Sequence, residues 1–274
     1  MKNMILNQIR SILIKDFLIE YSYKGRFIYS ILFIFIQLAV FYFLSGFLET
    51  SYTKNNESPI SNLYGFFILG ICFLDISYTL ISYVSIKIEE YKKIGIFEEL
   101  FILPVHPIRL ILMSNIYPVI FSLFKLIIYL LCGLLFFGLE VDESINLLIL
   151  VFTISFGLVT LVSISLIASS LSILYYSGVY ISTIHNTISL LFGGVLYPVS
   201  YMYKDLFFLE LFIPLHSILD LARYALGLYE MNNQDLIINI FLVIIHSVIF
   251  ALIGFISIKI AFKKAFREGR ISFY

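Results

Sequence analysis

Two side chains of opposite charge interrupt the most apolar parts of the chain. Asp75 stands near the middle of one charge-poor run, residues 60–86, and Lys125 stands near the middle of the next, residues 110–139. A charged group inside a membrane is costly, so such residues usually pair with each other or serve transport. The residue types therefore predict either an ion pair that joins two neighbouring helices or a path that relays a proton or an ion.

The motifs of catalytic sites are missing from the sequence. It has no G-x-x-x-x-G-K-[ST] loop for a nucleotide phosphate, and none of its glycines precedes a lysine. Neither H-E-x-x-H nor G-x-S-x-G occurs. His185 and His246 have no second ligand at metal-site spacing, and Cys72 and Cys132 lie within apolar runs. We therefore expect no catalytic residue, cofactor or metal in this chain.

The elements that must position Asp75 and Lys125 are membrane spans. Of the 274 residues 61% are hydrophobic and 13% are charged, far from the composition of a soluble domain. A helix needs about 20 mostly apolar residues to cross a bilayer. Residues 144–203 contain no Asp, Glu, Lys or Arg, which is too long for one helix, so a turn is expected at residues 175–178. Six spans are thus predicted, at residues 27–48, 60–86, 110–139, 147–176, 179–197 and 236–258.

The charges between the spans predict the topology. Fourteen of the 18 Lys and Arg residues fall within residues 1–26, 87–109 and 259–274, and positive residues collect on the cytoplasmic side. Both termini and the loop at residues 89–107 are therefore expected in the cytoplasm, below the plasma membrane.

The ends of the chain complete the predicted fold. The first 26 residues place apolar side chains on one helical face, interrupted by Asp16 and Glu20, which favours a helix lying in the membrane interface. We predict one all-α integral membrane domain, residues 1–274, with this interfacial helix at its start. The formal net charge of zero gives no reason to expect a nucleic-acid partner.

The second cytoplasmic segment is more elaborate than a simple turn and reads EEYKKIGIFEELFILP. Gly95 can end the preceding helix. Phe97 and Phe101 would then share one side of a short helix beside Glu98, and Pro104 would stop it. The segment is either an amphipathic helix that binds a partner or an interfacial helix that only connects two spans.

The same stretch resembles a motif of ABC-2 type transporter permeases. In that family a pattern like E-x-x-x-x-G-T-L-E-x-L-L-x-T-P joins the second and third spans and forms the coupling helix that docks into a partner ATPase. Ile96 and Leu103 stand here where the family has threonines. The positions that match the motif are Glu90, Gly95, Glu98 and Pro104, with Phe97 and Phe101 at its apolar positions.

A second match follows the predicted fifth span. Residues 198–235 contain too many prolines and charges to cross lipid alone, so short extracytoplasmic helices that enter the outer leaflet are expected there. Asp220 and Arg223, three residues apart, could form a structural pair or contact substrate. Ile213, His216 and Ser217 depart from the family's asparagine, threonine and tyrosine. The residues that resemble the family's small-Gly-x-x-x-Pro and P-L-x-x-x-x-D-x-x-R patterns are Gly194, Pro198, Pro214, Leu215, Asp220 and Arg223.

The resemblance extends over essentially the whole chain and implies the membrane subunit of an ABC exporter. Two copies of the chain would form a pore of twelve spans, with the first and fifth spans meeting across the dimer. Two copies of a separate ATPase subunit would bind ATP and Mg. The apolar spans favour an amphiphilic or hydrophobic cargo, such as a drug or a lipid.

Two other functions are compatible with a membrane protein of this size. One is a stand-alone ion-coupled transporter or channel that uses Asp75 and Lys125 as its relay. The other is a membrane enzyme, which the missing catalytic residues disfavour.

Overall fold

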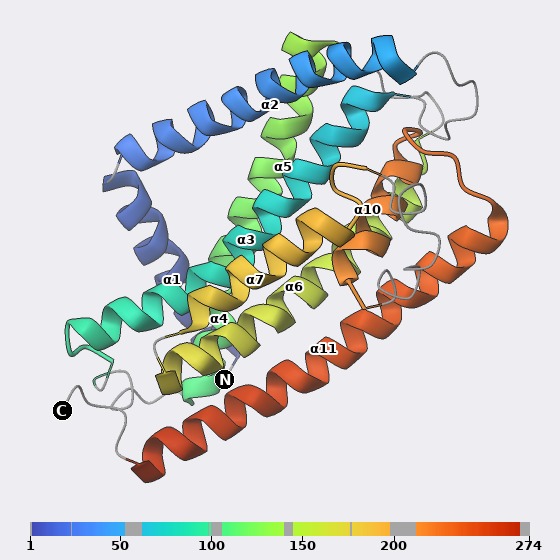
Figure 1. The fold of residues 1–274 in the computed structure, drawn as a ribbon. Coiled ribbons are helices and arrows are strands. Elements are labelled where there is room, and N and C mark those ends of the chain that lie inside the picture. The colour runs from blue at the N-terminus through green and yellow to red at the C-terminus, as the bar shows by residue number, and fades with distance from the viewer. Residues whose placement is uncertain are drawn as a thin grey trace.

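The computed structural model is a bundle of helices (Figure 1). It describes residues 2–22, 24–52, 62–97, 99, 106–139, 145–175, 177–197 and 212–268. Five stretches in this part of the chain are long and apolar enough to cross a membrane: Ile28–Leu48, Leu63–Lys93, Pro107–Phe137, Leu147–Tyr175 and Asn233–Arg267. The described residues contain no β-strand and nine helices: α1 (Lys2–Ser22), α2 (Lys24–Tyr52), α3 (Leu63–Lys93), α4 (Pro107–Ser114), α5 (Ile116–Phe137), α6 (Leu147–Tyr175), α7 (Gly178–Phe192), α10 (Pro214–Ala225) and α11 (Asn233–Glu268). The predicted all-α membrane class is confirmed.

The long uncharged region does turn back where the sequence predicted. Helix α6 ends at Tyr175 and α7 begins at Gly178. Helix α7 has 15 residues, and at about 1.5 Å per residue this is shorter than the hydrocarbon core of a bilayer. It is not among the five long stretches, so the sixth span remains a prediction.

The third predicted span is divided into two helices. Helix α4 ends at Ser114 and α5 begins at Ile116, with Asn115 between them. Pro118 has no amide for the carbonyl of Ser114, which weakens the helix at this point. The side chain of Asn115 donates to the carbonyl of Ile111 at 2.9 Å and accepts from the hydroxyl of Ser165 at 2.9 Å. The break is therefore fastened to α6.

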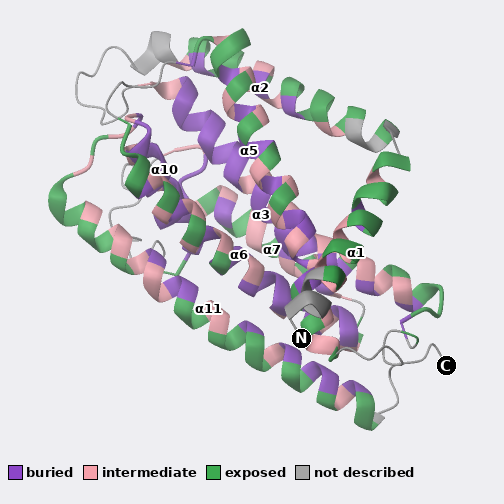
Figure 2. Cartoon of the chain, turned by 180° about the vertical axis from the view of Figure 1, so that it is seen from behind, coloured by how far each residue is buried: buried purple, intermediate pink, exposed green. Residues whose placement is uncertain are grey.

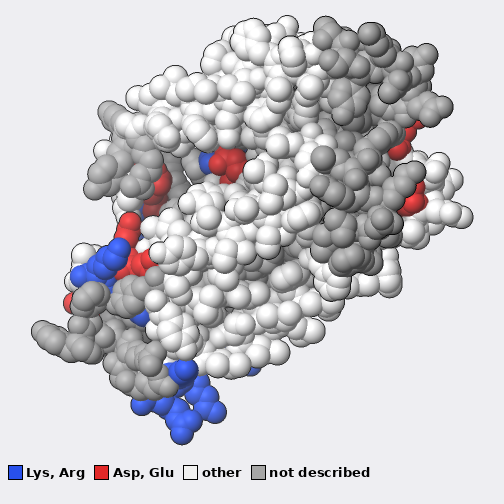
Figure 3. Space-filling view, in the orientation of Figure 1, with Lys and Arg blue, Asp and Glu red and all other residues white. Residues whose placement is uncertain are grey.

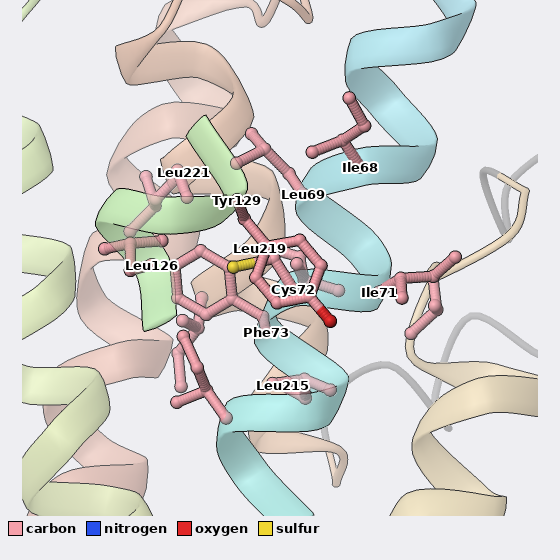
Figure 4. Close-up of a cluster of buried hydrophobic side chains, with 14 of the residues drawn as sticks. Ile68, Leu69, Ile71, Cys72, Phe73, Leu126, Tyr129, Leu215, Leu219 and Leu221 are labelled. Carbon is pink, nitrogen blue, oxygen red and sulfur yellow. The ribbon is translucent and has the colours of Figure 1, made fainter. Parts of the chain in front are cut away.

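Helix α3 lies at the centre of the bundle. It contacts α2, α5, α6, α7 and α10, and its side chains are mostly buried (Figure 2). Figure 4 shows the core where Cys72 of α3 lies among Leu126 and Tyr129 of α5 and Leu215 and Leu219 of α10. The second span is thus an internal helix, and it carries Asp75.

Helices α2 and α11 lie on opposite sides of the bundle, with α3, α7 and α6 between them (Figure 1). Lys and Arg side chains gather at one end of the molecule, where α11 ends with Lys263, Lys264 and Arg267 (Figure 3). Most of the middle of this face is uncharged. This distribution is typical of a protein embedded in a membrane.

The N-terminal helix α1 is fastened by the acid that interrupts its apolar face. Asp16 is 1% exposed, and its Oδ1 lies 2.6 Å from Nζ of Lys87 on α3. Lys15 donates to the hydroxyl of Tyr91 at 2.8 Å. Burial would lower the pKa of Lys15, but the hydrogen bond to Tyr91 and the charge of Asp16 raise it above its ordinary value. Asp16 is therefore an anchor to α3.

Candidate functional site

The structure brings Asp75 and Lys125 together between α3 and α5. Nζ of Lys125 donates to Oδ2 of Asp75 at 2.9 Å and to the hydroxyl of Thr79 at 3.0 Å. The side chains of Lys125 and Asp75 are only 11% and 16% exposed. Each charge therefore has its opposite charge beside it in a largely apolar environment, and removal of either would leave the other unpaired.

Two further polar residues complete this cluster. The Tyr129 hydroxyl donates to Oε1 of Gln37 on α2, and it also lies 3.4 Å from Oδ2 of Asp75. Tyr129 comes four residues after Lys125, so a search for polar side chains on the same helix face would have found it. Only the fold shows that Gln37 joins them. The cluster connects α2, α3 and α5.

The polar cluster consists of side chains that hold three helices together. It contains one carboxylate, and the described residues contain no group of three His, Cys, Asp or Glu that could hold a metal ion. Its polar groups bind one another across three helices. The arrangement thus supports the ion-pair interpretation more directly than an open relay.

The second sequence motif centres on Arg223, which is completely buried. Its guanidinium donates to the carbonyls of Gly194 at 2.8 Å, Phe66 at 2.9 Å and Val195 at 3.2 Å. It also lies 3.4 Å from the centroid of the Phe66 ring, where a cation is attracted by the π-system. One side chain therefore joins α10 to α3 and to the chain that follows α7.

The predicted neighbour of Arg223 is also in place. Oδ1 of Asp220 lies 3.6 Å from Nη1 of Arg223, and Oδ2 lies 3.5 Å from Nε2 of His216. Pro214 is the first residue of α10, a position where a missing amide is tolerated. Pro198 lies outside the described residues. Because most of α10 is buried in the bundle, the geometry favours a structural role for this pair over a substrate contact.

A glycine on α3 makes room for this cluster. A Cβ on Gly70 would lie 2.2 Å from the carbonyl oxygen of Val195 and 3.0 Å from Nη2 of Arg223. The chain after α7 can therefore reach Arg223 only because position 70 has no side chain. Sequence reasoning did not single out Gly70, which lies in an apolar run without any local turn signal.

The variant Gly70→Ala is expected to lower stability by about 1–3 kcal/mol, because the added methyl group forces the Val195 carbonyl and Arg223 apart. Thermal unfolding of the purified protein in detergent measures the loss. The matched control is Gly46→Ala on α2, where an added Cβ meets nothing within 4 Å. Equal stability of the two variants would contradict the close approach at Gly70.

The predicted coupling segment is described only in its first part. Helix α3 ends at Lys93, and Gly95 has a φ of +76°, so this glycine does terminate the helix. Glu90 is exposed in the last turn of α3. Phe97, expected in a docking surface, is 3% exposed and packs into an apolar cluster between α3, α4, α6 and α11. The ring of Phe97 is therefore packed inside the bundle and is not on its surface. The coupling residues outside the described part are Glu98, Phe101 and Pro104.

Comparison with known protein families identifies the family of this chain. The sequence pattern of the ABC-2 type transporter family matches residues 7–226, which include the Gly95 segment, the Asp75–Lys125 pair and Arg223. No individual curated protein matches the chain. Because the family pattern covers most of the chain, the protein belongs to the ABC-2 type transporter family, the membrane permease components of ABC transporters.

Proposed function

We propose that this chain is the membrane-spanning permease subunit of an ATP-driven exporter. The observation that carries the proposal is the family match over residues 7–226 in a chain whose sequence has no phosphate-binding loop. The energy for transport is proposed to come from an ATPase subunit that binds this chain. No enzymatic activity is proposed for this chain.

The segment from Gly95 to Pro104 is proposed as the place where the ATPase docks. Its start lies at the end of α3, the central helix of the bundle, so a movement applied there acts directly on the core. Phe97 ties the segment to the cluster between α3, α4, α6 and α11. ATP-driven closure of two ATPase subunits would tilt these helices and switch the pathway from inward to outward access.

A second copy of the chain is proposed as the other half of the pathway. Only 17% of the most apolar stretch of α2 is buried, and its exposed side chains include Tyr29, Phe43 and Phe47. Helix α7 also exposes the apolar side chains of Ile184 and Ile188, four residues apart, which lie on one helical face. These two faces correspond to the first and fifth spans and suit the proposed dimer contact.

The cargo is proposed to be amphiphilic or hydrophobic, such as a drug or a lipid. The exposed faces of α2, α5 and α11 are rich in Phe, Leu and Ile. Both termini are proposed to face the cytoplasm at the plasma membrane, in line with the basic residues at the end of α11 (Figure 3). The alternative of an ion relay at Asp75 and Lys125 is weaker, because the two side chains are already paired with each other.

The charge reversal Glu98→Lys tests the docking role. It is expected to reduce the amount of ATPase subunit that co-purifies with the permease, because the reversed charge would meet the groups that now accommodate a carboxylate. The measurement compares this yield, and the ATP hydrolysis of the reconstituted complex, with the unchanged chain. Glu230→Lys, which reverses an exposed acid between α10 and α11, is the matched control. If Glu98→Lys retained full docking and coupled transport, the assigned role would be wrong.

A further inference from the structure

Two charged residues in the last turns of α3 bind the turn between α6 and α7. Glu89 and Lys92 stand three residues apart, so they project from the same side of the helix. Oε1 of Glu89 accepts from the hydroxyl of Ser172 at 2.8 Å and from the backbone amide of Gly178 at 3.2 Å. Lys92 donates to the carbonyl of Ser172 at 3.1 Å and to that of Ile173.

The two charges match the helix ends that they contact. Ser172 and Ile173 lie in the last turn of α6, where the final carbonyls have no partner within the helix and the dipole is negative. Gly178 is the first residue of α7, where the free amides and the positive end of the dipole favour an acid. One turn of α3 therefore satisfies the end of α6 with a cation and the start of α7 with an anion.

The contact is buried and closely fitted. Lys92 is 3% exposed and Ser172 is fully buried. A Cβ on Gly178 would lie 2.0 Å from the Ser172 hydroxyl and 2.2 Å from the carbonyl of Ala168, so α7 can start this close to α6 only with glycine. A close-packed interior is hardly compressible, so a displacement of one helix is transmitted to the helices packed against it.

The same contact reaches the proposed docking segment. Nζ of Lys92 lies 5.5 Å from the ring centroid of Phe97, and Phe97 and Ile173 belong to the same apolar cluster. The amide of Phe97 donates to the carbonyl of Tyr91, which lies in the last turn of α3. Contacts thus run from the Gly95 segment through Lys92 to α6, and Glu89 extends them to Gly178 at the start of α7. Both helices lie beside α3 (Figure 1).

We propose that Glu89 and Lys92 are the positioning residues that make α3, α6 and α7 move together when the ATPase acts on the Gly95 segment. The inference rests on the proposed function, because it assumes that an ATPase docks at this segment. Without the two charges the ATPase still docks and still moves the end of α3, but α7 no longer follows.

The test follows each helix separately in the full complex. Single cysteines replace Ile94, at the end of α3, and Tyr180, near the start of α7; these side chains are 63% and 67% exposed. The native Cys72 and Cys132 are replaced by alanine. The rate of maleimide labelling is measured with and without Mg-ATP and vanadate, which trap the ATPase. In the otherwise unchanged chain, nucleotide trapping is expected to alter the rate at both positions.

The double variant Glu89→Met/Lys92→Met removes both charges; it is expected to retain the nucleotide response at Ile94→Cys and to lose it at Tyr180→Cys, while the ATPase still co-purifies. Ser172→Ala removes one hydrogen-bond donor to Glu89 with little change in volume and is expected to weaken the response at Tyr180→Cys alone, so it decides the outcome if the double variant does not accumulate. The matched control is Lys93→Met, which removes an exposed lysine from the same turn and is expected to leave both responses intact.

Two results would overturn the inference in distinguishable ways. If Glu89→Met/Lys92→Met and Ser172→Ala keep both nucleotide responses, the ATPase drives the permease but the two charges do not position α7. If even the chain with native Glu89 and Lys92 binds no ATPase and shows no nucleotide response at either cysteine, the proposed function fails and this inference fails with it.

Discussion

Replacement of Arg223 by methionine is expected to remove most of the folded protein from the membrane fraction. The guanidinium is fully buried and serves the carbonyls of Gly194, Val195 and Phe66. Methionine fills part of the space but leaves these carbonyls without their donor and removes the cation that lies 3.6 Å from Asp220. Breaking a buried charge network of this kind costs about 3–5 kcal/mol, a large share of the stability of a typical domain.

The yield of monodisperse protein after extraction and its unfolding temperature measure the effect. Arg223→Lys is expected to have a yield and an unfolding temperature between those of the unchanged chain and those of Arg223→Met. An ammonium keeps the charge but cannot reach three carbonyls with a planar fork of donors. The control is Arg109→Met, which removes an exposed arginine. If Arg223→Met matched the control in yield and unfolding temperature, Arg223 would not hold α10 against α3.

Single substitutions in the polar cluster of α2, α3 and α5 form the second large prediction. Lys125→Met leaves the Asp75 carboxylate without its cation. Asp75→Asn leaves the Lys125 ammonium without a carboxylate, beside the neutral Thr79 hydroxyl and the Phe121 ring. Each change is expected to destabilise the protein by about 3 kcal/mol, because the remaining charge has lost its partner in an apolar environment. Unfolding in detergent is the measurement, with the exposed Lys93→Met as the control.

The double variant Asp75→Asn/Lys125→Met separates the pair from other roles. This variant removes both charges. Its loss in free energy of unfolding is therefore expected to be smaller than the sum of the two single losses by about 1–3 kcal/mol. Strictly additive losses would contradict a direct pair. Single variants that fold normally but lose transport would instead support the ion-relay alternative.

Much of the fold could be predicted from hydropathy and charge. The reversal between α6 and α7 follows from an uncharged run too long for one helix, and the end of α3 follows from Gly95. The approach of Asp75 and Lys125 follows from their similar depth in consecutive spans, because unpaired charges are costly there. These predictions needed only local spacing and the thickness of the bilayer.

The rest depends on contacts between distant parts of the chain. The sequence predicted Arg223 beside Asp220 on a short extracytoplasmic helix, but the fold brings to Arg223 its principal partners, Phe66 and Gly194. Phe97 was predicted on the apolar side of a short amphipathic helix, and the cluster that buries it is assembled from four helices. Hydropathy indicates that a side chain is apolar or charged, and it does not show which neighbour will cover it.

To find whether this permease works with a separate ATPase, the tagged chain is purified from its native membrane in mild detergent and its stoichiometric partners are identified by mass spectrometry. A co-purifying subunit that carries a phosphate-binding loop is expected, in equal copies with the permease. A homo-oligomer without any ATPase, reproduced after crosslinking in the intact membrane, would contradict this expectation and would direct attention to ion coupling at Asp75 and Lys125.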